Sequence, residues 1–147
     1  YQVARFLAES YRDDPIAIGE LGYIALYHDG PLTDVYGLGD HEVLTATMQH
    51  RKDAGFFADL QRERGFRVVV TYTFTMSDLT PPGWYPVADW RSPRAYFQTT
   101  RFWATDPAEV APLLAHLRAY EPTLPDDVRV HYNELAPLAA AEALDGG

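Results

Sequence analysis

The run RVVVTYTFT, from Arg67 to Thr75, restricts the fold of this chain more than any other segment. β-Branched and aromatic residues fill it, and such residues favour a strand. Residues 96–105 alternate between apolar and polar side chains, so they predict a second strand that pairs beside the first. The centre of the fold is therefore expected to be a sheet.

Three helices are expected before this pair. Residues 2–11 place apolar side chains at helical spacing, and the acids and proline at 13–15 end that helix. Residues 40–50 are a second candidate. Asp53 can cap a third helix, which ends before Gly65.

The C-terminal part also begins with a helix signal. Asp106 caps, Pro107 takes the first helical position and Glu109 closes a capping box. Residues 133–144 then form an Ala-rich terminal helix that is interrupted near Pro137.

The remaining segments complete the expected fold class. Residues 16–19 and 32–36 read as strands separated by one helical turn, which suggests parallel pairing, and 128–132 is a last strand. The fifteen residues after Thr80 contain four prolines and predict a long surface excursion rather than an element. We expect one α/β or α+β domain over residues 1–147, with a mixed sheet of about four or five strands flanked by helices.

The charge balance limits the partners. The net charge is −9, whereas phosphate backbones are bound by clustered Lys and Arg, so nucleic acid is not an expected partner. Lys52 is the only lysine against eleven arginines, which is typical of a GC-rich genome. The absence of cysteine excludes disulfides and thiolate metal sites.

No apolar run approaches the roughly 20 residues needed to cross a bilayer. Residues 1–15 lack the basic start and apolar centre of a signal peptide. The chain opens with YQVARFLAESY, already in helical pattern and without an initiator Met. We therefore expect it to be a piece of a longer protein.

The segment from Ile16 to Asp40 contains five glycines but no phosphate-binding pattern. A dinucleotide loop needs G-x-G-x-x-G between a strand and a helix, and Gly19 to Gly22 gives only G-x-x-G. In the later GLGDHE, acids follow the glycines and would repel phosphate. No nucleotide or other cofactor is expected.

The same segment gathers oxygen and imidazole side chains that hard cations and zinc prefer. The residues of this acidic cluster are Glu20, Asp29, Asp34, Asp40 and His41. In one interpretation a small acid/base or metal-dependent enzyme uses Glu20, Asp34 and His41, with adjacent Glu20 and Asp34 raising one carboxyl pKa. In the other, Asp29 and Asp40 serve turns and caps, Asp34 accepts backbone N–H bonds, and no metal binds.

An aromatic group in the proline-rich segment is a second candidate site. Amphipathic rings on a surface loop can stack on sugars, and nearby arginines can reach phosphates. The carbohydrate-binding residues of this hypothesis are Trp84, Tyr85, Trp90, Arg91 and Arg94. The alternative is that the rings fold down to cover a face of the sheet. The three serines, Ser10, Ser77 and Ser92, lie outside any G-x-S-x-G pattern, so no catalytic triad is expected.

The segment IAIGELGYIALYHDGPLTDVYGLGD resembles a stretch of the C-terminal soluble domains of multi-spanning bacterial glycosyltransferases of the GT-C type, which use polyprenyl-phosphate sugars. The matching residues are Ile16 to Ile18, Glu20, Gly22, Tyr23, Asp29, Asp34, Gly37 and Leu38. YQVARFLAES is similar to the helix that leaves the last membrane span of such proteins. RERGFRVVV is similar to a later helix–strand junction, with Gly65-Phe66 in place of the usual Pro-Asp.

This resemblance implies a domain outside the cytoplasm, at the cell envelope of an actinobacterial source, attached to its own membrane-embedded portion. The catalytic Asp of that family lies in the membrane part, so the resemblance gives no residue here a catalytic role. The domain would be a non-catalytic accessory that helps to hold the acceptor glycan, shapes the mouth of the active site or stabilises the membrane bundle. Its candidate ligands are a cell-envelope glycan and a polyprenyl-phosphate sugar. Gly19, Gly22 and Gly37 would then allow short strands and turns to pack closely. The small standalone enzyme and a purely structural or partner-binding module stay open as alternatives.

Overall fold

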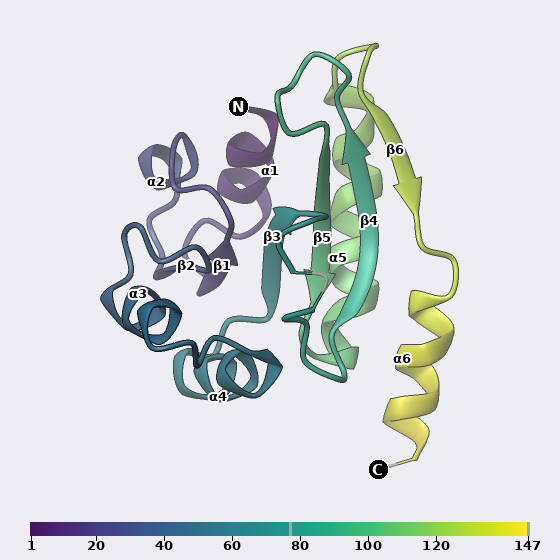
Figure 1. Cartoon of the computed structure of the whole chain (residues 1–147). Coiled ribbons are helices and arrows are strands. Elements are labelled where there is room, and N and C mark those ends of the chain that lie inside the picture. The colour runs from purple at the N-terminus through teal and green to yellow at the C-terminus, as the bar shows by residue number, and fades with distance from the viewer. Residues whose placement is uncertain (77, 147) are drawn as a thin grey trace.

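A six-stranded mixed sheet forms the centre of the fold in the computed structural model, which describes residues 1–76 and 78–146 (Figure 1). The strand order is β2-β1-β3-β5-β4-β6. The strands are β1 (Ile16–Ile18), β2 (Leu32–Asp34), β3 (Val68–Tyr72), β4 (Tyr85–Arg91), β5 (Thr99–Ala104) and β6 (Arg129–Tyr132). β1 runs parallel to both β2 and β3, whereas β5 pairs antiparallel with β3 and β4, and β4 with β6.

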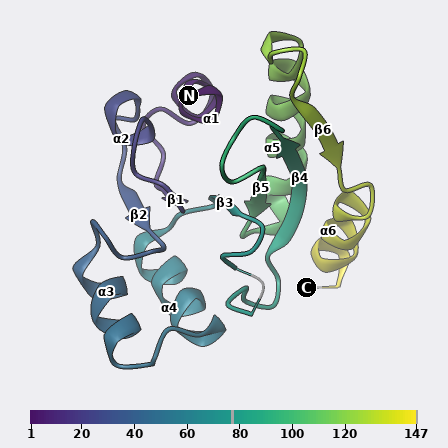
Figure 2. The same ribbon diagram turned by 45° about the horizontal axis from the view of Figure 1, so that its top comes forward.

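Helices cover both faces of the sheet (Figures 1 and 2). They are α1 (Gln2–Ser10), α2 (Ile24–Tyr27), α3 (His41–Met48), α4 (Ala54–Arg64), α5 (Pro107–Tyr120), the 3₁₀ turn η1 (Glu121–Thr123) and α6 (Ala136–Asp145). α1, α5 and α6 pack on one face, in a core with Phe6, Phe102 and Leu113 at its centre. α3 and α4 pack on the other face around Phe57 and Val69. Within the described residues, no helix has the length and apolar character of a membrane span.

The predicted fold class is confirmed, with one strand more than expected. The parallel pairing of the two short N-terminal strands is also confirmed, as is the pairing of Arg67 to Thr75 with residues 96–105. Asp53 caps α4, and Gly65 ends that helix in the left-handed conformation at φ 71°. The helix cap and the left-handed glycine depend on residues that are adjacent in the sequence, so the sequence alone predicts them.

The expectation of a surface excursion after Thr80 is wrong, because the middle of that segment is strand β4. β4 lies between β5 and β6, and its register shifts between Pro86 and Ala88. Since proline has no N–H to donate to the ladder, a bulge at that point lets the strand continue. The prolines therefore mark an irregular strand rather than a loop.

Two expectations about the C-terminal helices are also wrong. Asp106 caps α5 through the N–H of Ala108, but Glu109 does not complete a capping box. Its carboxylate is buried and accepts a hydrogen bond from Tyr11, the residue that follows α1, 3.0 Å away. Pro137 lies in the first turn of α6, where the missing N–H costs nothing, so it starts that helix instead of interrupting it.

Candidate functional site

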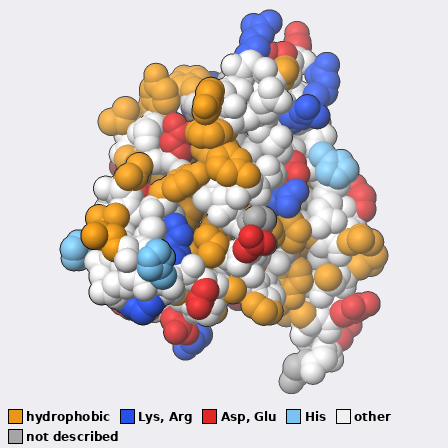
Figure 3. Space-filling model, in the orientation of Figure 1, with side chains coloured by type: hydrophobic (Ala, Val, Ile, Leu, Met, Phe, Trp, Pro, Cys, Tyr) orange, Lys and Arg blue, Asp and Glu red, His pale blue; other side chains and the backbone are white. Residues whose placement is uncertain are grey.

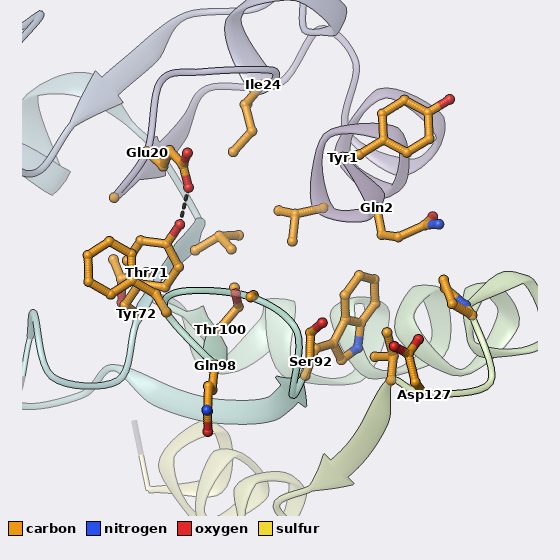
Figure 4. A pocket seen from close by; sticks show the side chains of 18 residues that line it. Tyr1, Gln2, Glu20, Ile24, Thr71, Tyr72, Ser92, Gln98, Thr100 and Asp127 are labelled. Atoms are coloured by element: carbon orange, nitrogen blue, oxygen red, sulfur yellow. Dashed lines mark hydrogen bonds between the residues drawn. The ribbon is translucent and has the colours of Figure 1, made fainter.

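A cleft of about 360 Å³ opens at the end of the sheet where β1 and β3 finish (Figure 4). Glu20 and Ile24 form one wall, Tyr72, Thr100 and Ser92 form the opposite wall, and the start of α1 lies alongside. The lining residues are Tyr1, Gln2, Val3, Gly19, Glu20, Ile24, Val70, Thr71, Tyr72, Trp90, Ser92, Ala95, Phe97, Gln98, Thr100, Pro125, Asp127 and Val128.

The topology explains why the cleft lies there. After β1 the chain turns to α2, whose Ile24 belongs to the core on the α1 and α5 face. After β3 it turns the other way, and Met76 and Trp84 enter the core on the α3 and α4 face. Parallel strands whose following segments go to opposite faces leave an opening at their carboxyl ends, a common position for ligand sites.

A close approach of the backbone shapes the floor of this opening. A Cβ placed on Gly19, just after β1, would lie 3.3 Å from the Cα of Thr71 on β3. The N–H of Gly19 also donates to the carbonyl of Val70 at 2.8 Å. Glycine therefore keeps the two strand ends in contact below the cleft.

The lining combines aromatic rings with oxygen-bearing side chains and carries negative charge. Tyr72, Phe97 and Trp90 supply rings, while Glu20 and Asp127 supply carboxylates. Among the described residues that line the cleft there is no Lys, Arg or His. Such a surface favours neutral or cationic ligands over anions.

The Tyr72 hydroxyl donates a hydrogen bond to Glu20 Oε2 across one end of the cleft (Figure 4). Burial raises the pKa of Tyr72, and the hydrogen bond and negative charge of Glu20 raise it further. Tyr72 therefore stays a neutral donor at physiological pH. The contact ties the turn after β1 to β3.

Asp127 lies near the other end of the cleft and has a cationic partner. Arg94 Nε is 3.1 Å from its Oδ2, and the Arg94 side chain is mostly exposed. The loop that carries Arg94 is closed by the Ser92 N–H, which donates to the Gln98 carbonyl at 2.8 Å. This loop brings Phe97 and Gln98 to the cleft.

Aromatic side chains that line the cleft, or contact rings that line it, are called the aromatic rim below; all of them are exposed except Tyr72, which is half-buried. The rim consists of Tyr1, Tyr23, Tyr27, Tyr72, Phe74, Tyr96 and Phe97. The Phe97 ring lies 4.5 Å from Tyr72, 5.2 Å from Phe74 and 4.9 Å from Tyr96, measured between centroids. On the side of the cleft formed by α1 and α2, the ring centroids of Tyr1 and Tyr23 are 6.1 Å apart. Hydrophobic side chains accordingly gather at this end of the molecule, in the upper part of Figure 3.

The acidic cluster separates into residues with different local roles. Asp34 is buried and accepts hydrogen bonds from the N–H groups of Tyr36 and Gly39. Asp40 caps α3 through the N–H groups of Glu42 and Val43. These are the turn and capping roles that the sequence left open as one interpretation.

The other members of the cluster do not join Asp34 and Asp40. Asp29 pairs with Arg12 at 3.0 Å, and His41 is exposed at the start of α3. Glu20 is bonded to Tyr72 and lines the cleft. Within residues 1–76 and 78–146, no three His, Cys, Asp or Glu side chains form a group that could hold a metal.

The aromatic residues predicted to bind carbohydrate are also dispersed. Trp84 is 8% exposed and Trp90 is 4% exposed, and they belong to the cores on opposite faces of the sheet. Tyr85 packs against the same core as Trp90, and Arg91 ends β4. Two of the five predicted residues are at the cleft: Trp90 in its lining and Arg94 on Asp127.

Trp90 retains a feature that suits a ligand site. Its indole Nε1 is buried and has no hydrogen-bond acceptor among the described residues. Buried donors normally find a partner, so this N–H is available to a bound molecule or water.

Sequence reasoning missed Tyr72, Phe97 and Asp127. Tyr72 has a signal, because it is a polar-tipped ring at the end of the clearest strand. Phe97 and Asp127 have none, because only the sheet topology brings their loops together. Ser92 lines the cleft, while Ser77 lies outside the described residues.

A family model described as "Domain of unknown function (DUF8728)" matches residues 1–110, which is most of the chain. The chain belongs to this family. No curated protein and no solved structure matches this chain. The matched region supplies every lining residue of the cleft up to Thr100, whereas Pro125, Asp127 and Val128 lie beyond it.

Proposed function

We propose that this domain binds a glycan in the cleft without catalysing a reaction, as an accessory part of a membrane sugar transferase at the outer face of the cell membrane. The observation that carries the binding part is the combination of the aromatic rim with carboxylate and amide groups in one open cleft. Rings offer flat apolar faces to the C–H surface of a sugar, and oxygens accept its hydroxyl protons.

The charge of the cleft favours the acceptor glycan over the polyprenyl-phosphate donor. Glu20 and Asp127 line the cleft, and no cationic side chain among the described residues does so. A phosphate group would face carboxylates without a neutralising partner in the lining. A neutral saccharide has no such penalty.

The arrangement of the carboxyl groups supports a binding role. A general acid in glycoside chemistry needs a carboxyl in an apolar pocket. Glu20 is exposed and bonded to Tyr72, and Asp127 is paired with Arg94. Both carboxylates therefore join neighbouring segments at the cleft and can accept hydrogen bonds from a ligand.

The binding part is tested by titrating the domain with neutral oligosaccharides while recording amide NMR shifts. We expect shifts at Glu20, Tyr72, Phe97 and Gln98. Phe97→Ala should weaken binding about three- to tenfold, because a stacked ring is lost. Leu138→Ala, on an exposed position of α6, is the matched control and should leave affinity unchanged. An absence of shifts with every saccharide, or shifts spread over α6, would contradict the proposal.

Tryptophan fluorescence gives an independent measurement. Trp90 lines the cleft, whereas Trp84 and Trp103 lie in the core on the other face. Trp90→Phe should remove the fluorescence change on glycan binding, and Trp84→Phe should keep it. The reverse result would place the ligand elsewhere.

The membrane part of the proposal rests on the resemblance of residues 16–40 to GT-C type domains. It is tested by reading the gene upstream of the codon for Tyr1. Several apolar spans of about 20 residues each would support it. A start codon directly before this domain, with no such spans, would refute the membrane part of the proposal. The glycan-binding part would then still depend on the titration described above.

A further inference from the structure

We propose that the sugar unit held in the cleft carries a positively charged amino group, and that Glu20 is its counterion. This inference rests on the proposed glycan-binding function and names the class of glycan: an amino sugar with a free ammonium group. It follows from the charges of the cleft, from the partners of its two carboxylates and from the rings beside Glu20.

The two carboxylates of the cleft differ in how their charge is compensated. Asp127 has Arg94 at 3.1 Å. Glu20 forms no ion pair with any described residue, and its one side-chain hydrogen bond comes from the neutral Tyr72 hydroxyl. Glu20 is therefore the carboxylate in the lining that lacks a positive partner.

One oxygen of the exposed Glu20 carboxylate also has no donor within the described residues. Tyr72 occupies Oε2, and no donor among the described residues reaches Oε1. The backbone next to Oε1 is that of Gly22, whose added Cβ would lie 3.4 Å from it. An ammonium group has three donors and no acceptor, so it can satisfy Oε1 without disturbing the Tyr72 contact.

Aromatic rings beside Glu20 add a second attraction for a cation. The Tyr72 ring, whose hydroxyl bonds to Glu20, lies 4.5 Å from the Phe97 ring, and both rings line the cleft. The face of an aromatic ring attracts ammonium groups, most strongly where water is partly excluded. A neutral sugar would use the same rings for stacking only, so the added charge is what distinguishes the two ligands.

The test compares two oligosaccharides of equal length and linkage: N-acetylglucosamine trimer and its fully deacetylated counterpart, in which each acetamide is replaced by a free amine, at a pH where the amine is protonated. NMR titration of the wild-type domain should show about two- to fivefold tighter binding of the deacetylated trimer, the effect expected of one exposed ion pair. That advantage should shrink as NaCl is raised, because salt screens the pair.

Variants assign the effect to Glu20. Glu20→Gln keeps an acceptor for Tyr72 but removes the charge, so it should abolish the preference for the deacetylated trimer. Glu63→Gln removes an equal charge from exposed helix α4, outside the cleft lining, and should keep the preference. Tyr72→Phe should keep the preference as well, since the ring and the Glu20 charge remain.

The outcomes separate this inference from the proposed function. Equal cleft binding of the two trimers by the wild type, or a salt-independent preference, would overturn the amino-sugar assignment while glycan binding stands. Equal losses of preference in Glu20→Gln and Glu63→Gln would trace it to overall charge and would also overturn the assignment. Binding of neither trimer, nor of any neutral saccharide, would refute both.

Discussion

Glu109 lies in the first turn of α5, yet its carboxylate interacts with a residue 98 positions earlier in the chain. Tyr11 donates to Oε1, and Arg67 lies 3.6 Å from Oε2. Burial raises the pKa of Tyr11, and the neighbouring charge of Glu109 raises it further, so the tyrosine remains a donor. This hydrogen bond between two side chains joins the end of α1 to the first turn of α5.

A double-mutant cycle on Tyr11→Phe and Glu109→Ala should give a coupling free energy of about 1 kcal/mol, because each change removes one partner of a buried contact. Glu109→Ala alone should cost about 2–4 kcal/mol, since it leaves the Tyr11 hydroxyl unpaired. Urea unfolding measures these values, with exposed Glu134→Ala as the neutral control. Zero coupling would mean that Glu109 acts within its own helix.

Two glycines with positive φ form a matched pair. Gly37 has φ 90°, and an added Cβ would lie 2.6 Å from the Leu44 nitrogen. Gly65 has φ 71° and no atom within 4 Å of that position. Gly65→Ala should therefore cost about 1–2 kcal/mol, the strain of the left-handed conformation alone. Gly37→Ala should cost clearly more, at least about 3 kcal/mol, because backbone must also move. Thermal unfolding that shows equal losses would contradict this account of the glycines.

At the scale of elements, Arg64 joins the end of α4 to the start of α3. It contacts both Asp40 and Glu42, the latter at 2.7 Å. Burial opposes ionisation of Asp40, but the hydrogen bonds from Arg64 and from the N–H groups of Val43 and Glu42 outweigh it and lower the pKa of Asp40. The helix cap and the ion pair thus use the same carboxylate.

Asp40→Asn should keep the cap but lose the charge, at a cost of about 1 kcal/mol at pH 7. Because the folded pKa lies below the unfolded value of about 3.9, this contribution is present above pH 4. It should disappear as the pH falls through the folded pKa. Urea unfolding at several pH values checks this, with the more exposed Glu42→Gln expected to change less. A difference that stays constant down to low pH would refute the ion-pair role.

At the scale of the whole molecule, the family match ends inside a structural unit. Residue 110 lies near the start of α5, but Leu113, Leu117 and Tyr120 of that helix fill the core against α1 and the sheet. β6 then pairs with β4. The fold therefore needs the segment beyond the matched region, and so does the cleft, which takes Asp127 from it.

Truncation after residue 110 should abolish folding. Each lost core side chain is worth about 2–5 kcal/mol, and together they exceed the usual stability of a domain. Truncation after residue 134 removes only α6, whose buried residues are Ala136 and Ala140, and should leave a folded protein. Circular dichroism and NMR dispersion distinguish the two, and a folded 1–110 fragment would contradict this.

The sequence by itself determined the local features. Helix caps at Asp53 and Asp106, the left-handed Gly65 and the strand at Arg67 to Thr75 depend on chemistry within a few residues, so their patterns were readable. The mixed α/β class followed from their order. Even the roles of Asp34 and Asp40 as turn and cap were among the stated alternatives.

Tertiary structure decided the rest. Strand β4 was not predicted because it contains Pro86, a residue that is rare inside strands. The segment is held as a bulged strand by its pairing with β5 and β6, which are distant in sequence. The Glu109 side chain does not cap its own helix, because it accepts a hydrogen bond from the buried Tyr11 hydroxyl instead. The cleft joins Glu20, Phe97 and Asp127 from three loops. Their proximity is set by strand order, a long-range property that no local pattern encodes.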